Sequence, residues 1–239
     1  MFYVRSVLAS AAALALAGSA FAGGDLITVT GPAGLKASAE FTIINPTTLQ
    51  ISLKNLSTGV PVGFTEAAQI LTGVSWDFGL PGANLSDPTI TGGSVVIGAT
   101  SFSVNFSTGS FGPGDDVSAE WGYGNAPSGA SLQNFLSALQ AGTTQFPGVN
   151  RDGPTNVDGP QGGVVANPPI LDLSGLGAVQ NEVVPTLTLS KSISNLEFLY
   201  TNLVRFEFGS DAAFITNPTP GASALLLIGG LAAARRRRN

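Results

Sequence analysis

The chain of 239 residues contains no cysteine and no histidine. The missing thiols exclude disulfides and thiolate nucleophiles, and the missing imidazoles exclude Ser/His catalytic triads. The two absences together exclude Cys/His zinc sites and haem ligation of the usual kind. We therefore expect no cofactor and none of the more familiar hydrolase mechanisms.

Positive charge is scarce in the body of the chain. Five of the ten Lys and Arg residues lie at the two ends, as Arg5 and the run Arg235, Arg236, Arg237 and Arg238, whereas all 15 acids fall between Asp25 and Asp211. The body has a formal charge of 5 − 15 = −10. It has too few cations to neutralise a phosphate backbone, so nucleic acid is excluded as a partner.

The N-terminus has the pattern of an export signal. Arg5 precedes an apolar run over residues 7–17, and Ala20-Phe21-Ala22 has the small residues that signal peptidase requires at its cleavage site. We predict a signal helix over residues 1–22 that is removed after Ala22, which makes the export machinery and signal peptidase expected partners.

The C-terminus carries a second signal, over residues 217–239. Pro218, Thr219 and Pro220 precede an apolar segment over residues 222–234, which the four terminal arginines follow. As a helix this segment is only about 20 Å long, against roughly 30 Å of bilayer hydrocarbon. The positive-inside rule places the arginines in the cytoplasm and the body outside.

This tail resembles the sorting signals of exosortase substrates, the Pro-Glu-Pro type of many Gram-negative bacteria, with Thr219 where the commonest form has Glu. The resemblance implies an exosortase-type processing enzyme as partner, a transient stay in the inner membrane, and delivery to the cell surface or extracellular matrix. An ordinary C-terminal tail anchor is the alternative.

Between the signals, residues 23–216 read as one all-β passenger domain, a β-sandwich or jelly roll. Residues 41–43 and 49–53 alternate apolar and polar side chains around an Asn45–Thr48 turn, which predicts a hairpin. Alternation predicts further strands over the ranges 74–78, 85–91, 94–97, 101–106, 117–123, 170–173, 183–190, 196–200 and 204–208.

Two segments depart from this pattern. Leu132, Phe135, Leu136 and Leu139 have the spacing of one helix face, which predicts a short helix over residues 131–141. Residues 143–169 are rich in glycine and proline and predict a long irregular loop. Asp152 and Asp158 lie in this loop without the regular spacing of calcium ligands, so no metal site is expected.

Carboxylates are the plentiful titratable groups. Glu120, close to Asp115 and Asp116, is the best candidate for a carboxylate-dependent glycosidase. A solvated strand face and a turn at Asp115-Asp116 explain the same residues, and we expect no catalysis.

Aromatic side chains offer a second possibility. Trp121 and Tyr123 share one strand face and are candidates for an exposed platform that stacks on sugars, with exopolysaccharide as the ligand. Trp76 alternates in phase with Val74 and Phe78 and is expected in the core.

The body also resembles a family of exosortase-dependent surface proteins, through short segments such as Glu120-Trp121-Gly122-Tyr123 and Arg151-Asp152-Gly153. That family implies no activity. The sequence therefore predicts an exported, noncatalytic envelope or extracellular-matrix protein. A carbohydrate-binding module is the second hypothesis, and a glycosidase is the third.

Overall fold

The computed structural model describes residues 24–59, 66–79, 87–125, 132–139, 143–151, 160–166, 175–210 and 213–217. The two expected terminal helices lie outside these ranges, as do the N-terminal signal and all of the C-terminal signal except Asn217. The described part is mainly β-sheet, so the all-β prediction is confirmed.

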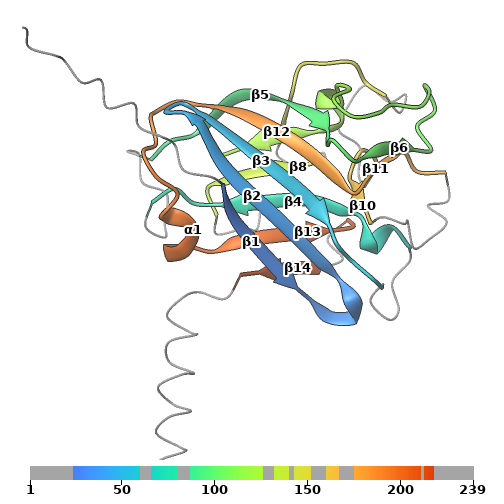
Figure 1. Ribbon diagram of the computed structural model, residues 1–239, viewed down its shortest axis with the longest axis horizontal. Coiled ribbons are helices and arrows are strands. Elements are labelled where there is room, and N and C mark those ends of the chain that lie inside the picture. Colours follow the sequence, from blue (N-terminus) through green and yellow to red (C-terminus); the bar gives the residue numbers. More distant parts are fainter. Residues whose placement is uncertain are drawn as a thin grey trace, which may run out of the picture.

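The first sheet has five strands, in the spatial order β1 (Asp25–Thr30), β2 (Lys36–Asn45), β3 (Thr48–Asn55), β12 (Glu182–Leu189) and β5 (Ile90–Ile97). All of its pairs are antiparallel. Figure 1 shows β12, in orange, between β3 and β5, although it lies more than a hundred residues from β3 in the chain.

The second sheet is assembled from shorter strands. One path runs β6 (Phe102–Val104), β11 (Ala178–Gln180), β10 (Val164–Val165), β4 (Leu71–Trp76), β8 (Asn134–Ser137), β7 (Gly122–Gly124) and β9 (Thr144–Gln145). β13 (Val204–Phe208) joins β4 from its other edge, and β14 (Ala213–Thr216) pairs with β13. Among the described strand pairs, β10 and β11 form the one parallel pair.

The short helical elements are α1 (Phe198–Thr201) and three 3₁₀ turns: η1 (Pro32–Gly34), η2 (Glu66–Gln69) and η3 (Ser118–Glu120). The first sheet lies across the second in Figure 1. Alternate residues of both sheets form one hydrophobic core, with Phe41 and Ile51 from the first and Trp76 and Phe206 from the second. One face of each sheet is thus removed from water, which is the main stabilising contribution.

The predicted hairpin is confirmed. β2 and β3 pair antiparallel on either side of the turn, and the side-chain oxygen of Asn45 accepts hydrogen bonds from the backbone N–H and the hydroxyl of Thr47. Asn45 thereby supports the turn with its own side chain. Along β3, Leu49, Ile51 and Leu53 are fully buried, as their alternation requires.

The helix predicted over residues 131–141 is wrong where the structure describes it, because Asn134–Ser137 form β8. This strand lies between β4 and β7, and all four of its residues are buried. A strand that is buried on both faces has apolar residues at consecutive positions. Phe135 and Leu136 are such a pair, and together with their apolar neighbours they produce the spacing of a helix face.

Three other predictions need correction. Residues 196–200, expected as a strand, contain the start of α1. Within the strand expected over 117–123, residues 118–120 form η3. The two strands expected over 85–91 and 94–97 are a single strand, β5, which begins at Ile90. The loop expected over 143–169 contains the short strands β9 and β10, while 152–159 and 167–169 lie outside the described residues. The strand expected over 170–173 lies wholly outside them too.

Candidate functional site

Glu120 and Trp121 hold the two ends of the segment that contains Asp152 and Asp158. A Glu120 carboxylate oxygen accepts a hydrogen bond from the backbone N–H of Arg151. The Trp121 indole N–H donates to the carbonyl oxygen of Gly162, at 3.1 Å. Residues 152–159 between these ends are outside the described part of the chain. The pair therefore ties Arg151 and Gly162 to the chain that leads into β7.

The expectation of an exposed aromatic platform is wrong for Trp121, whose exposed fraction is 0%. Tyr123 is half-buried: its ring packs on Phe146 with centroids 4.9 Å apart, and its hydroxyl donates to the carbonyl of Thr91. Trp76 is fully buried in the core, as predicted. The two aromatics chosen from the sequence thus serve packing.

The carboxylates near Glu120 support turns. An Asp115 oxygen accepts from the N–H of Gly112 at 2.8 Å, and an Asp116 oxygen accepts from the N–H and hydroxyl of Ser118. Glu120 is only 2% exposed, so it offers no carboxylate to a sugar substrate. The turn interpretation is confirmed for Asp115.

Arg151 completes this cluster. Its Nε donates to the carbonyl of Asp116 at 3.0 Å, and its guanidinium lies 4.2 Å from the centroid of the Phe111 ring. One of the five body cations is therefore used to fasten the loop base to the turn after β6.

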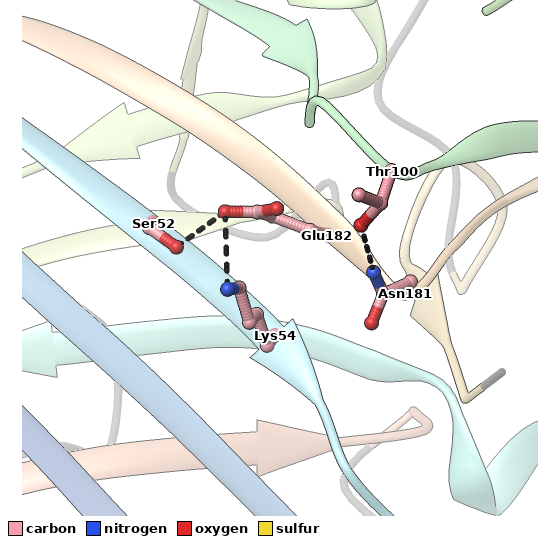
Figure 2. Close-up of polar contacts among 5 residues, drawn as sticks. All are labelled: Ser52, Lys54, Thr100, Asn181 and Glu182. Carbon is pink, nitrogen blue, oxygen red and sulfur yellow. Dashed lines mark hydrogen bonds and ion pairs between the residues drawn. The ribbon is translucent and has the colours of Figure 1, made fainter. Parts of the chain in front are cut away.

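A second polar cluster lies where the chain passes from one sheet to the other (Figure 2). Asn181 stands between β11 and β12 with a φ of 76°, a left-handed conformation that Asn tolerates better than most residues. Its side-chain amide donates to the hydroxyl of Thr100 at 2.9 Å. The adjacent Glu182 accepts from the Ser52 hydroxyl and lies 3.7 Å from the Lys54 ammonium. This arrangement aligns β12 with β3.

A groove that no sequence pattern indicated lies between the end of β4, the segment before β5 and the segment around α1. It has a volume of about 440 Å³. Phe78 and Phe198 form its apolar part, with their ring centroids 4.9 Å apart and edge to face. The polar part includes Ser192, Ser194 and Glu197, all exposed.

Asp77 is buried next to this groove. Burial is the largest effect and raises the pKa of its carboxyl. The backbone N–H of Gln133 donates a hydrogen bond to this carboxyl and lowers the pKa, while the negative charge of Asp87 raises it. The exposed Tyr200 hydroxyl of α1 donates a hydrogen bond to Asp25 at the start of β1, and this bond raises the pKa of the hydroxyl. The groove thus lies in a region dominated by acidic groups.

The remaining predicted site residues are outside the described part of the chain: Ala20 and Ala22 at one end, and Pro218 to Pro220 and Arg235 to Arg238 at the other. Within the described residues there is no group of three or more carboxylates placed to hold a metal ion. The same residues include no helix long and apolar enough to span a membrane.

The chain was compared with models of known protein families, with curated proteins and with solved structures, and none of the three comparisons finds a match.

Proposed function

We propose that the chain is an exported, noncatalytic protein of the bacterial envelope or extracellular matrix. Its residues 23–216 form a β-sandwich passenger of jelly-roll type, and residues 217–239 form a sorting signal that an exosortase-type enzyme processes. On this proposal, signal peptidase removes residues 1–22, and the apolar segment 222–234 holds the protein in the inner membrane before processing.

The supporting observation is the position of Asn217, next to the proposed processing motif. Its side-chain oxygen accepts from the N–H of Val204 at 2.7 Å, and its own N–H donates to the carbonyl of Val204 at 3.0 Å. Its amide also donates to the carbonyl of Leu199. Asn217 is 7% exposed, so the folded part extends one residue past the expected boundary at 216, to the residue just before Pro218.

This arrangement favours a division of labour at Pro218. The two prolines restrict the backbone and remove two amide donors, so they favour an extended peptide that a processing enzyme can reach. The described residues of the passenger have a hydrophobic core of their own. On this proposal, the tail serves only as a sorting signal.

The decisive experiment measures the mass of the mature C-terminus in a host that carries an exosortase. We expect a chain that ends at or near Pro218–Pro220, and a matched variant with Arg235 to Arg238 replaced by serine should accumulate unprocessed or escape the inner membrane. Recovered surface protein that still contains residues 225–239 would show that the tail is a simple anchor and would refute the processing proposal.

A further inference from the structure

The groove beside α1 is held open by hydrogen bonds between segments that are distant in sequence. The amide of Asn202, which is 4% exposed, donates to the carbonyls of Asp77 and Gly79 and so ties the end of β4 to the end of α1. The N–H of Ile193 donates to the carbonyl of Pro46 at 2.7 Å, which fixes the other wall to the hairpin turn. The groove is therefore formed before any ligand arrives.

The third wall is fixed in the same way. The N–H of Ser190 donates to the carbonyl of Thr89 at 2.9 Å, and the Ser190 hydroxyl accepts from the N–H of Thr89. These bonds position Pro88, which lines the groove, against the segment that carries Ser192 and Ser194. A preformed groove of about 440 Å³ is within the size range of small-molecule sites.

The lining combines one aromatic surface with several short polar groups. Phe78 is half-buried, and its inner contacts are edge-to-face with Trp76, at 5.9 Å between centroids, and with Phe198. Around it lie the hydroxyls of Ser192 and Ser194 and the amide of Asn195, all on exposed residues. An apolar ring next to hydrogen-bonding groups matches a sugar, which has an apolar face and a rim of hydroxyls.

Charge restricts the class of sugar. Among the described residues that line the groove, Glu197 is charged and none is Lys or Arg. Asp77 directly precedes Phe78, and the Asp87 carboxylate lies against Gly79. Residues 23–216 as a whole carry a formal charge of −10. A phosphate or uronate would meet a negative potential here, with no cation among the described residues that line the groove.

We propose that this groove binds a neutral hexose unit of an oligo- or polysaccharide. The Phe78 ring contacts the apolar face of the sugar, while Ser192, Ser194, Asn195 and Glu197 bind its hydroxyls. The inference rests on the proposed function only for the source of the sugar, because a protein of the envelope or matrix is surrounded by polysaccharide. The site is distinct from Trp121 and Tyr123.

The test uses the full-length chain in mild detergent, titrated with maltohexaose, cellohexaose and mannohexaose as neutral probes and with hexagalacturonate as the anionic one. Binding is followed by calorimetry and by tryptophan fluorescence, since Trp76 touches the Phe78 ring. We expect at least one neutral probe to bind saturably and hexagalacturonate to bind at least about tenfold more weakly.

Two groove variants and one control sharpen the result. Phe78→Leu keeps apolar volume but removes the ring, and should weaken binding about fivefold. Ser194→Arg, at an exposed position, places a long cation in the groove and should reverse the preference toward hexagalacturonate. Phe102→Leu removes a ring that is 55% exposed outside the groove and should leave the affinity unchanged.

Failure to bind any neutral probe overturns the proposal, and so does binding that both groove variants leave intact or a wild-type preference for hexagalacturonate. These outcomes are independent of the processing test, which reads the mass of the C-terminus. A correctly processed protein that ignores all neutral probes would refute the groove alone. An unprocessed chain that binds them would refute the sorting proposal alone.

Discussion

The two sheets differ in how much of their architecture lies close together in the sequence. In the first sheet, β1, β2 and β3 follow one another in the chain and pair in that order. In the second, β4 takes its partners from residues 134–137, 164–165 and 204–208. Strands that pair with their neighbours in the chain can be predicted from the sequence pattern. Where short strands pair with distant segments, the pattern does not indicate which segments pair.

The largest effect is expected at Trp121, in the second sheet. Trp121→Ala empties a fully buried site and leaves the carbonyl of Gly162 without its donor, so it should cost about 3–5 kcal/mol of unfolding free energy. Ile51→Val, in the first sheet, should cost about 0.5–1.5 kcal/mol. Denaturant unfolding measures both, with Trp121→Phe as the variant that loses mainly the hydrogen bond. A cost below about 1 kcal/mol for Trp121→Ala would contradict a stabilising role for the buried ring and its bond to Gly162.

The passage between the sheets should be the next most sensitive place. Asn181→Ala puts an ordinary L-residue at a φ of 76° and removes the bond to Thr100, so we expect a loss of about 1–2 kcal/mol. Asn181→Gly also loses that bond but accepts the backbone conformation, and should be the milder change. Equal losses in the two variants would assign the effect to the amide rather than to the backbone.

Asp77 gives the second sheet a pH dependence. Because burial raises its pKa, its contribution to stability is fully present below the unfolded value of 3.8 and is lost as the pH rises through the raised value. Asp77→Asn keeps an oxygen that can accept from the N–H of Gln133 and removes the charge. The variant should therefore melt at a higher temperature than wild type near neutral pH, and the difference should vanish below about pH 4. A difference that is independent of pH would exclude titration of Asp77 as its origin.

The smallest effect is expected on the outer face of the first sheet. Lys54 is 38% exposed and 3.7 Å from the Glu182 carboxylate, so Lys54→Met should cost less than about 1 kcal/mol. Thermal melts in low and high salt provide the check, because the wild-type advantage should shrink as salt screens the pair. A cost that grows with salt would contradict an electrostatic origin.

The successes and failures of the sequence predictions follow the same division. The β2–β3 hairpin and the alternation of Val204, Phe206 and Phe208 along β13 were predictable, because each strand records in its own period of two which side faces the core. β8 and α1 were misassigned, since segments of four residues are too short for periodicity to separate helix from strand.

By itself, the sequence determined the absence of thiol and imidazole groups, the acidic character of residues 23–216, and the apolar face of each long strand. Only the tertiary structure decided that Trp121 is buried and that Glu120 accepts a hydrogen bond from the backbone of Arg151. It also brought Phe78 and Phe198 into one groove, through an amide of Asn202 that bonds a carbonyl 125 residues away. The physical reason is that composition and periodicity are properties of a residue and its neighbours in the chain. The exposure of a side chain depends instead on which distant segment packs against it.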